Sequence, residues 1–518
     1  MLKKTFVLVL GVFLLAACFV WAGGGSQTAA PEVSGGDPDI EVWRVFANGE
    51  KDITKNSPMY NLYKEKFGVG VISPYVEWNG GVAYLDKLNM QIAAGTMPNV
   101  FLPWNGNEAD LAKNGAIADL TDLLPKYAPN LWNLIPQSVW DVVKANDPTG
   151  KGRIYWVPEV YRYEKEWGLI RTDWLEKLGL QMPKTQAEYL AVLRAFRDRD
   201  PNGNGKADEI PTGGRAGARW MDHLFNMYGV AMYEGYPEWD IYNGELTYSA
   251  VTQNAKDALA FIRQLYAEKL IDPETLLNDK PGWESKVFAN RVGNYFHYTW
   301  ASYQFLTNIY QTSGVKATFG VLPVIQVPGY EGKGFVTWKP IGPPSLVVSA
   351  KQDEAHLMAC MKLLNGLGDQ SVWSDIEYGV EGMNHTVVNG KRSIIAPNSS
   401  QQVLLFHPFD LWGSLDVRVQ LLEESKTPDT EWMFNQSIKQ VKELQQYIHA
   451  IAGQGLPSTV YTDYPDIQNH SIWQEYASKI IIGTLPVSAF DEYVERWNRS
   501  GGAEVTKRAR EWYAKTKR

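Results

Sequence analysis

Apolar residues follow two alternating spacings along the chain, one typical of strands and one typical of helices. Residues 40–46 form a short apolar run that predicts a strand, and residues 99–102 form a second. Between them, apolar residues within 85–92 recur at helical spacing, and Gly95 predicts the end of that helix. Another helix should begin near Glu108. Because strands and helices alternate, we expect an α/β fold with a largely parallel sheet.

A further helix is predicted directly before a polar loop. Thr185 and Glu188 form a capping box, which satisfies backbone N–H groups at the start of a helix. Apolar residues at helical spacing then continue to Phe196, and the polar loop 198–211 follows. No second helix is predicted after this loop, because residues 209–214 contain a proline and two glycines. The segment is therefore a single helix with a loop, not a paired calcium sensor.

The loop 198–211 carries carboxylate and carboxamide side chains at alternate positions around two glycines. Ca²⁺ prefers such oxygen ligands, and glycine permits the tight turn that brings them together. A count that starts at Asp198 gives the regular calcium-loop pattern but puts Lys206 at a ligand position. A count that starts at Asp200 is preferred. The predicted metal ligands are then Asp200, Asn202, Asn204, the carbonyl group of Lys206, Asp208 and Glu209, with Gly205 at the bend.

Two interpretations of this loop are open. A single loop of this kind more often stabilises a fold than transmits a signal, so we expect a structural Ca²⁺ ion. The alternative is a solvated polar loop that binds no metal. The dense and ordered series of oxygen ligands favours the metal site.

Length, composition and charge predict a large globular body. The chain has 518 residues, of which 45% are apolar and 13% aromatic, enough to build two or more lobes. Lys and Arg total 50 against 58 Asp and Glu, which gives a net charge of −8. Such a chain lacks the basic surface that neutralises phosphates, which argues against nucleic-acid binding. We expect a monomer.

Residues 1–22 have the pattern of a secretory leader. Lys3 and Lys4 precede an apolar run that small residues follow. Two processing routes fit this segment: a bacterial lipobox that ends at Cys18, which would then be lipidated, or signal-peptidase cleavage after Ala22. Either route exports the protein to the periplasm or to the outer face of the cytoplasmic membrane.

The rest of the chain is predicted to be soluble. Residues 23–39 are rich in Gly, Ser, Ala and Pro and predict a flexible linker. No later stretch is long and apolar enough to span a membrane, so membrane contact is expected only through a lipid anchor. Apart from Cys18, the chain contains only Cys360, so the mature body has no internal disulfide. Cys360 lies in an apolar helical pattern, which predicts a core residue and not a catalytic thiol.

A series of short segments spans nearly the whole mature chain. The segments are 95–100 (GTMPNV), 115–120 (GAIADL), 151–158 (KGRIYWVP), 170–180 (IRTDWLEKLGL), 182–185 (MPKT), 378–382 (YGVEG), 490–497 (FDEYVERW) and the glycines at 501 and 502. In this order they resemble family 1 extracellular solute-binding proteins of bacterial ABC importers. The resemblance is to the long, sugar-associated type that carries a calcium loop.

The resemblance implies an α/β, two-lobe periplasmic-binding-protein fold of type II-like form, with a ligand cleft between lobes that a multi-segment hinge joins. Residues 40–165 would begin lobe 1, residues 166–343 would form lobe 2 and residues 344–518 would complete both. The chain would cross between the lobes near 163–168 and 343–348. An oligosaccharide or glycoside would close the lobes, and the importer's membrane subunits would recognise the closed state. The resemblance also implies that the six loop residues bind Ca²⁺.

Aromatic rings, on which sugars stack, are the expected ligand contacts. Trp104 follows the strand 99–102, at the strand end where open α/β sheets bind ligands. Trp300 ends a segment that presents an aromatic ring to the cleft in sugar-binding relatives. Arg44 and Arg162 have the fork geometry that suits uronate carboxylates, with structural ion pairs as the alternative. The weaker ligand-binding candidates are Trp43, Arg44, Trp78, Tyr163, Trp338 and Trp412.

Other aromatic and titratable residues are predicted to be structural. Trp174, Trp497 and Trp512 lie at helical spacing and should pack in the core. His407, which stands beside Pro408 and Phe409, is interpreted as a hydrogen-bonded core histidine.

Two other functions stay open. An exported glycoside hydrolase or lyase would need two carboxylates that the fold brings together, which sequence spacing does not reveal. No nucleophile elbow, His-Glu-x-x-His zinc motif or phosphate-binding glycine loop occurs, so we expect no catalysis. A binding protein that reports to a membrane receptor without delivering its ligand would show the same sequence features.

Overall fold

The computed structural model describes residues 37–44, 52–77, 81–104, 106–217, 219–388, 390–395 and 405–516. The chain divides into a unit of residues 1–36 and a unit of residues 37–518, and the second unit holds every helix and strand of the described residues. The predicted leader, Cys18, most of the predicted linker and Trp78 lie outside the described residues. Among the helices of the described part, none is long and apolar enough to cross a membrane.

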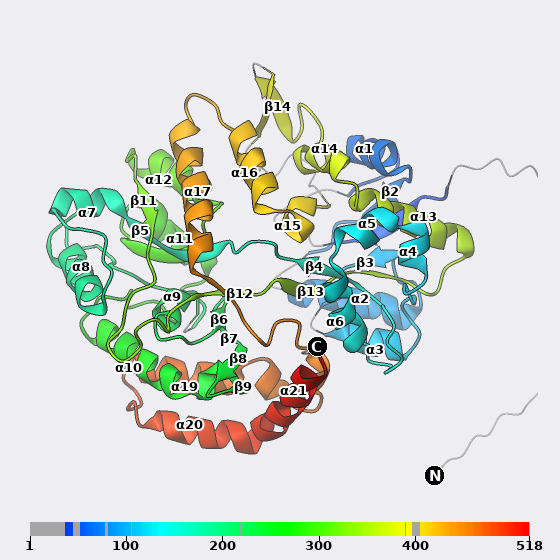
Figure 1. Ribbon diagram of the computed structural model, residues 1–518. Coiled ribbons are helices and arrows are strands. Elements are labelled where there is room, and N and C mark those ends of the chain that lie inside the picture. Colours follow the sequence, from blue (N-terminus) through cyan, green and yellow to red (C-terminus); the bar gives the residue numbers. More distant parts are fainter. Residues whose placement is uncertain are drawn as a thin grey trace, which may run out of the picture. The chain divides into compact units, whose positions relative to one another are not determined.

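The first sheet contains strands from the two halves of the chain (Figure 1). Its order is β2 (Val71–Ile72), β1 (Ile40–Trp43), β3 (Val100–Phe101), β13 (Ile341–Val348) and β4 (Val157–Val160). β1 pairs in parallel with β2 and β3, whereas β13 is antiparallel to β3 and β4. Four of these five strands, β2, β1, β3 and β4, therefore run in the same direction, as expected for a largely parallel sheet, and β13 runs against them. β13 enters this sheet where β4 leaves it, so the two strands run in opposite directions.

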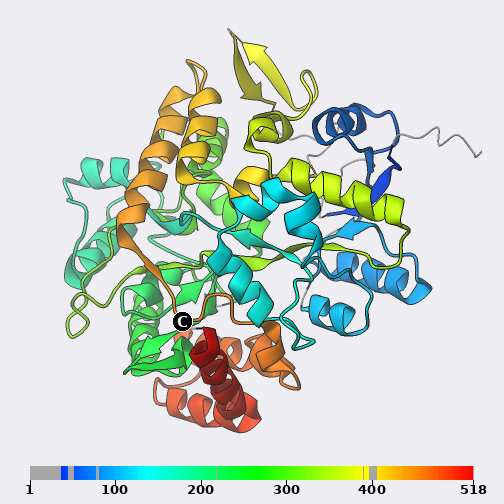
Figure 2. The ribbon, with the colours of Figure 1, turned by 45° about the vertical axis from the view of Figure 1, so that its right-hand side comes forward.

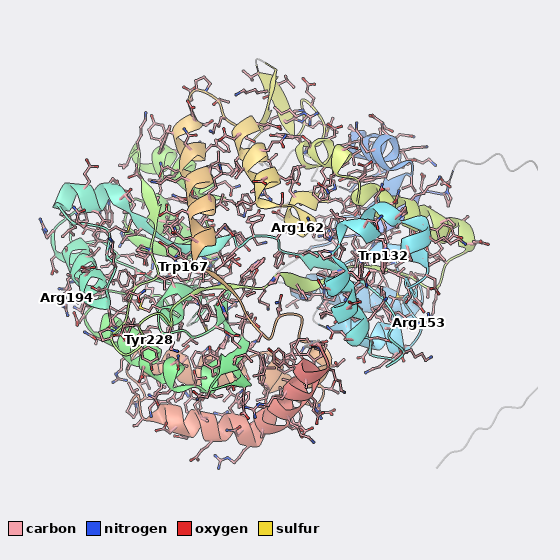
Figure 3. The ribbon with its side chains drawn as sticks, viewed as in Figure 1. Trp132, Arg153, Arg162, Trp167, Arg194 and Tyr228 are labelled. Atoms are coloured by element: carbon pink, nitrogen blue, oxygen red, sulfur yellow. The ribbon has the colours of Figure 1, made fainter. Side chains whose placement is uncertain are left out.

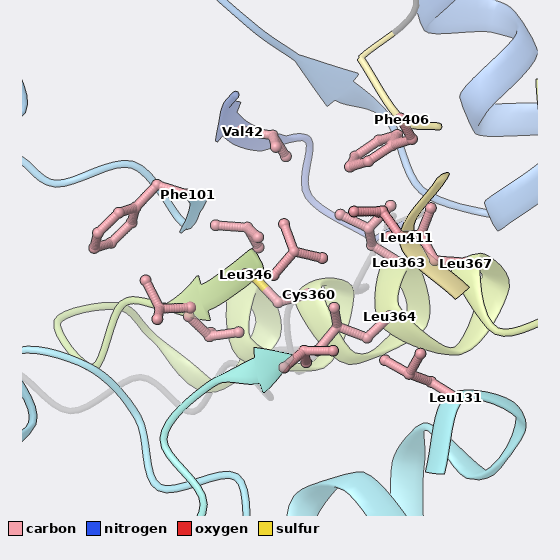
Figure 4. Packing of buried hydrophobic residues seen from close by; sticks show 14 of the residues in the cluster. Val42, Phe101, Leu131, Leu346, Cys360, Leu363, Leu364, Leu367, Phe406 and Leu411 are labelled. Atoms are coloured by element: carbon pink, nitrogen blue, oxygen red, sulfur yellow. The ribbon is translucent and has the colours of Figure 1, made fainter. Parts of the chain in front are cut away.

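Helices pack around this sheet and enclose an apolar core (Figure 4). Val42, Phe101 and Leu346 come from three strands, and Cys360 and Leu364 come from α13. Cys360 is fully buried, and burial raises the pKa of its thiol to about 12, so it is a core residue as predicted. The helices are α1 (Pro58–Phe67), α2 (Val82–Ala94), α3 (Asn107–Lys113), α4 (Leu123–Tyr127), α5 (Pro129–Leu134), α6 (Gln137–Ala145), α13 (Glu354–Leu367), α14 (Trp373–Tyr378) and α15 (Pro408–Trp412).

The second sheet is antiparallel and has the order β10 (Asn294–Tyr298), β5 (Glu166–Arg171) and β11 (Phe319–Val321). Trp174 and Trp497 are buried in the apolar cluster next to it, and Trp512 is also buried, as predicted. The helices in this part are α7 (Thr172–Leu178), α8 (Gln186–Asp198), α9 (Asp222–Asn226), α10 (Gln253–Ala267), α11 (Lys280–Phe288), α12 (Ser302–Ser313), α17 (Glu431–Leu444), α18 (Pro465–Gln468), α19 (Ser471–Ile481) and α20 (Ala489–Trp497). Three separate two-stranded hairpins also occur in the described residues. They pair β6 (Met232–Tyr233) with β7 (Tyr236–Pro237), β8 (Trp239–Tyr242) with β9 (Glu245–Tyr248), and β14 (His385–Val388) with β15 (Lys391–Ile394).

Two helix boundaries predicted from the sequence are confirmed. α2 ends at Gly95, which has a left-handed φ of 71° that glycine adopts without steric cost. Before α8, the Thr185 side chain accepts from the N–H of Glu188, whose carboxylate accepts in return from the N–H of Thr185. Both signals involve residues close in sequence, so the surrounding fold does not alter them.

The chain passes between the two sheets at several points. Residues 161–165 join β4 to β5, and residues 339–340 join β12 (Val336–Trp338) to β13. After α15, α16 (Leu415–Glu424) leads to α17, and β16 (Ile448–Ala450) then pairs in parallel with β12. The Gln445 side chain bonds both backbone groups of Glu164, at 2.7 and 3.0 Å, and so joins the first crossing segment to the end of α17.

The C-terminal helix makes a further connection. α21 (Ala503–Thr516) lies beside α6, which Figure 2 shows with α21 in red and α6 in cyan. The indole N–H of Trp512 donates to Oδ1 of Asn146 over 2.9 Å. The end of the chain thus contacts a helix that packs on the first sheet.

Candidate functional site

A cavity of about 590 Å³ is lined by strands of the first sheet together with segments that belong to neither sheet. Residues 341–344, the first half of β13, form part of its lining, and other parts come from the hairpin β6–β7 and the loop after β16. Pro343 and Pro344 cannot donate to a strand ladder, and β13 pairs irregularly with β4 there. The second half of β13, residues 345–348, is buried in the first core. One strand therefore anchors the cavity wall in the sheet.

The hairpin β6–β7 presents aromatic and acidic side chains to the cavity. Tyr233 pairs with Tyr236, and both turn residues have left-handed backbone angles, with φ of 49° at Glu234 and 82° at Gly235. Two successive positive φ values are typical of the tight turns that suit β-hairpins. A Cβ at Gly235 would lie 2.5 Å from the side chain of Arg219, so only glycine fits. Tyr233, Glu234 and Tyr236 all line the cavity.

Sequence reasoning missed this hairpin. The available signal was the dipeptide Glu234-Gly235 between two tyrosines, a short turn flanked by residues that favour strands. Other lining aromatics that the sequence did not single out are Trp156, Tyr161, Trp239 and Tyr461. They come from segments far apart in the chain, so no spacing connects them.

Several ring faces at the cavity are already in contact with other groups. Tyr236 stacks on His470 with ring centroids 4.8 Å apart, and the Arg219 guanidinium lies 3.8 Å from its ring centre. The ammonium group of Lys165 lies 4.4 Å from the ring centre of Tyr161. Trp104 is 36% exposed, much more than the lining residues Trp156 and Trp239, which are buried. Among these lining tryptophans Trp104 offers the most ring surface to a ligand.

Charged groups at the cavity occur mainly in pairs. The Lys339 ammonium lies 2.6 Å from a Glu238 carboxylate oxygen. Burial lowers the pKa of Arg44 although the nearby carboxylate of Glu159 opposes the change. The pKa of Glu159 is raised by burial, which outweighs a hydrogen bond of 2.5 Å from the Tyr161 hydroxyl and the attraction of Arg44.

Two of the ligand-binding residues predicted from the sequence line this cavity, and others do not. Trp104 and Arg44 are part of the lining. Trp43 and Trp412 differ from the expectation, because both are buried in the first core. The indole N–H of Trp412 donates to the carbonyl of Pro158 over 2.9 Å, which holds the ring under β4.

Three further candidates serve contacts within the fold. Trp338 donates its indole N–H to the carbonyl of Tyr161 over 2.9 Å. The Tyr163 hydroxyl accepts from Nε of Arg418 over 3.1 Å, and the guanidinium of the same arginine lies 4.2 Å from the ring centre of Trp300. None of these three aromatic residues belongs to the described lining of the cavity. Trp78 lies outside the described residues.

The contacts of Arg162 and His407 show how these two polar residues differ from the roles predicted for them. Arg162, labelled in Figure 3, donates from Nη2 to the carbonyl of Leu134 over 2.5 Å and does not line the cavity. His407 is not a core histidine as predicted, because its side chain is 45% exposed. Its Nδ1 lies 3.3 Å from Oε1 of Glu377, and Asp410 contributes a third potential metal-binding atom to this group.

The predicted metal loop is organised by its own side chains. Oδ1 of Asp200 accepts from the N–H of Gly203 over 2.9 Å, and Oδ2 accepts from that of Gly205 over 3.1 Å. Oδ1 of Asp208 accepts from the amides of Asn202 and Asn204 over 3.1 and 3.0 Å. The side chains of the predicted ligands therefore converge within one turn. Although burial opposes it, these two amides hold the pKa of Asp208 below its usual value.

Glu209 gives an independent test of whether a cation fits. Its Oε1 is buried and has no hydrogen-bond partner among the described residues. Burial raises the pKa of Glu209, and the nearby Asp200 carboxylate adds to the increase. Two carboxylates that approach each other without a shared cation are unfavourable, and a bound divalent ion would relieve this. The donor set, which consists of oxygen atoms only, fits Ca²⁺.

Known proteins resemble this chain along its length. Lipoprotein LipO of Bacillus subtilis (strain 168) is 25% identical over 100% of this chain and 99% of its own. The fructooligosaccharide ABC transporter substrate-binding protein FusA of Streptococcus pneumoniae serotype 4 is 29% identical over 75% of each chain.

Solved structures share the fold. FusA of S. pneumoniae in complex with kestose has a TM-score of 0.67 at 19% identity, covering 92% of this chain and 99% of that one. The alginate-binding protein AlgQ2 without calcium has a TM-score of 0.65 at 20% identity, covering 93% and 99%. These neighbours are two-domain solute-binding proteins, so the α/β two-lobe fold expected from the sequence is confirmed.

The family assignment rests on a match to a whole-family sequence profile. The profile described as bacterial extracellular solute-binding protein matches residues 46–357, more than half of the chain. The match includes most of the strands and helices that line the cavity, together with the metal loop. This chain belongs to the bacterial extracellular solute-binding protein family.

Proposed function

We propose that this protein is the extracytoplasmic binding component of an ABC importer and that it captures an oligosaccharide or glycoside in the 590 Å³ cavity. The observation that carries the proposal is the composition of the lining, which combines aromatic rings with carboxylate and amide groups from the first sheet, the β6–β7 hairpin and neighbouring segments. Sugars present C–H faces that stack on rings and hydroxyls that bond to polar groups. The name of FusA, a fructooligosaccharide ABC transporter substrate-binding protein, supports the same class of ligand.

Ligand binding at this position would bias the arrangement of the two lobes. The cavity is lined both by β13, in the first sheet, and by β6–β7, which follows the second sheet's β5 in the chain. A ligand that contacts both sides stabilises the arrangement in which they lie close together. A membrane permease that recognises that arrangement would accept only the loaded protein.

The proposal includes a structural Ca²⁺ ion in the loop 200–209. Asp200, Asn202, Asn204, Asp208 and Glu209 would supply side-chain oxygens, and Lys206 would supply its carbonyl oxygen. Support comes from the unpartnered Oε1 of Glu209 and from a solved FusA structure whose printed description names an EF-hand mutant. The ion would neutralise the carboxylates of the loop at the end of α8.

A lipid anchor on Cys18 is also proposed. The lipobox pattern before this cysteine and the lipoprotein LipO among the relatives support it. The anchor would keep the binding protein near a permease in the cytoplasmic membrane.

Thermal unfolding of the protein from Asp37 onward, with Ca²⁺ present, tests the proposed function. A panel of oligosaccharides that includes kestose is added one at a time, and the mass of each recovered sugar is then measured by mass spectrometry. We expect one class to raise Tm in a saturable manner and to be recovered intact. Shortened or unsaturated products would instead assign the protein to the glycoside hydrolases or lyases. A panel without any Tm change would contradict the proposal.

A further inference from the structure

We infer that the cavity selects uncharged oligosaccharides and discriminates against those that carry uronate carboxylates. The inference rests on the proposed sugar-binding function of the same cavity and adds the charge of the ligand to it. It is carried by the partners of the charged side chains that line the cavity in the described part of the chain.

The cationic groups of the lining are already engaged. Lys339 lies 2.6 Å from Glu238 and also 5.0 Å from the ring centre of Tyr233. Arg44 donates to the carbonyl of Ser345 over 3.4 Å, and the Glu159 carboxylate lies near enough to oppose the lowering of its pKa. A uronate carboxylate would therefore have to compete with a protein carboxylate for either cation.

His470 does not add a positive charge. Its Nδ1 lies 2.7 Å from the Tyr248 hydroxyl, and its ring stacks on Tyr236. Burial, with the nearby cations of Lys339 and Arg219, lowers the pKa of His470 to about 3. The imidazole is neutral at physiological pH, with one nitrogen that donates and one that accepts, and Nδ1 already bonds to the Tyr248 hydroxyl.

The acidic groups outnumber the cations. Four glutamates, Glu108, Glu159, Glu234 and Glu238, belong to the described lining together with the two cations Arg44 and Lys339. Glu108 is buried and accepts a long hydrogen bond of 3.4 Å from the Ser458 hydroxyl, and Glu234 accepts from the Tyr298 hydroxyl over 3.3 Å. Behind the hairpin, three more carboxyls are buried in the crossing region: Glu164, Glu166 and Asp222.

This distribution favours hydroxyl groups over carboxylates in a ligand. A sugar hydroxyl donates a hydrogen bond, and bonds to an ionised acceptor such as Glu234 are stronger than neutral ones. A uronate carboxylate only accepts, so near Glu234 or Glu108 it would lose water without gaining a partner and would be repelled. The aromatic rings contribute equally to both ligands, so charge decides between them.

Arg219 and Lys165 are cations next to the cavity but outside its described lining. Arg219 lies 3.8 Å from the Tyr236 ring centre and donates from Nη2 to the carbonyl of Glu234 over 3.1 Å. Lys165 comes from the segment that joins β4 to β5. Its ammonium lies 4.4 Å from the ring centre of Tyr161 and 5.5 Å from that of Tyr298. Burial opposes the positive charge, but Asp410, Glu166 and Glu159 together raise the pKa of Lys165. The positive charge of this lysine is therefore shared with protein carboxylates and with two aromatic rings.

The experiment uses pairs of oligosaccharides with the same length and linkage, an oligogalacturonide and its carboxyl-reduced neutral counterpart among them, together with the neutral sugars of the unfolding panel. Affinities are measured by isothermal titration calorimetry at low salt and saturating Ca²⁺. We expect neutral sugars to bind at least about tenfold more tightly than their uronate partners. Equal or tighter binding of a uronate would overturn the inference while leaving the binding function intact. If no sugar of either kind binds, the proposed function fails and the inference fails with it.

Two variants locate the discrimination. Glu238→Gln removes the partner of Lys339, so we expect uronate affinity to rise severalfold while neutral affinity changes little. Glu234→Gln removes a repulsive carboxylate and should reduce the difference in affinity between a neutral sugar and its uronate partner. Glu176→Gln makes the same change of charge at an exposed position of α7, away from the cavity lining, and should leave the ratio of affinities unchanged. If Glu238→Gln and Glu176→Gln give the same ratio, the pairing of Lys339 does not set the selectivity.

Discussion

The metal loop and the cavity differ in how their residues are distributed along the chain. The predicted metal ligands lie within residues 200–209, whereas the cavity takes residues from as far apart as Arg44 and His470. In the loop, the backbone itself sets the spacing of the oxygen atoms. In the cavity, the fold must first bring the first sheet together with the β6–β7 hairpin and the segment after β16. One sequence therefore reveals the chemistry of the loop and leaves most of the cavity unseen.

The two regions also handle charge in opposite ways. In the loop, Oε1 of Glu209 is buried without a partner among the described residues, so an external cation is the group that would balance it. At the cavity, Lys339 and Glu238 balance each other at 2.6 Å. Removing a charge from the loop should therefore alter stability, and removing a charge from the cavity should alter ligand choice.

The largest expected effect comes from the loop. Asp200→Ala combined with Asp208→Ala should remove the dependence of unfolding on Ca²⁺. An ion at a thousand times its dissociation constant stabilises the folded state by about 4 kcal/mol, so the variant should lose a similar amount in saturating Ca²⁺. Urea unfolding with Ca²⁺ and with chelator measures both quantities.

Asp198→Ala is the matched control for this experiment. Asp198 forms an exposed ion pair of 2.6 Å with its neighbour Arg197. The preferred count from Asp200 gives Asp198 no metal contact, so we expect a loss below about 0.5 kcal/mol and an unchanged Ca²⁺ response. A loss of the Ca²⁺ response in Asp198→Ala would support the count from Asp198. If the double variant unfolds like the parent with and without chelator, the loop binds no stabilising ion.

The second effect contrasts the ionised carboxylates of the loop with protonated carboxyls near the crossing segments. Burial raises the pKa of Glu164 and of Asp222 to about 7 each, from ordinary values of 4.5 and 3.8. Between the ordinary pKa values and about pH 7, the folded protein holds protons on these two carboxyls that the unfolded chain has released. The free energy of unfolding should therefore fall as the pH rises through this window and level off above about 7.

We expect each of the two groups to contribute about 3 kcal/mol to the fall between pH 4.5 and 7.5, since each pKa unit corresponds to about 1.4 kcal/mol. Glu164→Gln should reduce the fall, because a carboxamide does not titrate in this range. Its oxygen still accepts from the N–H groups of Lys165 and Glu166, so the local fold is kept. Urea unfolding across this pH range at saturating Ca²⁺ measures the slope, with Glu176→Gln as the surface control. An equal slope in all three proteins would show that Glu164 does not hold a proton in the folded state.

Local signals explain what the sequence predicted well. The capping box of α8, the glycine end of α2 and the buried helix around Cys360 each depend on residues within one or two turns. The order of short family segments made the two-lobe fold predictable, because that order is specific even where each segment is weak. The direction of β13 was not predictable, since it depends on where the chain returns to the first sheet.

The cavity was predictable only in part, for a physical reason. Trp104 and Arg44 follow strands of the first sheet, at the strand ends where ligands of α/β sheets bind. Trp412 and Trp43 look the same in sequence, but the surrounding helices bury them. The hairpin that carries Tyr233 and Tyr236 follows β5 in the chain, and only the folded structure shows that it shares a cavity with residues of the first sheet.

The smallest expected effect compares two tryptophans that the sequence treats alike. Trp104 lines the cavity with 36% of its surface exposed, whereas the Arg418 guanidinium lies 4.2 Å from the ring centre of Trp300, outside the lining. Trp104→Ala should weaken binding of the best sugar by about 1–1.5 kcal/mol, the size of a stacking contact. Trp300→Ala should leave the affinity unchanged and lower the stability instead, because Arg418 loses its ring contact.

Calorimetric titration and urea unfolding of both variants separate these outcomes, and Trp104→Phe sharpens them. The phenyl ring keeps a stacking face, so its loss of affinity should be smaller than that of Trp104→Ala, provided that Trp104 acts through its ring. An equal loss of affinity in Trp104→Ala and Trp300→Ala would mean that the ligand extends past the cavity lining toward α12 and α16. Unchanged affinity in Trp104→Ala would place the sugar elsewhere, on the rings of the hairpin β6–β7, because no other tryptophan in the described lining has comparable exposed surface.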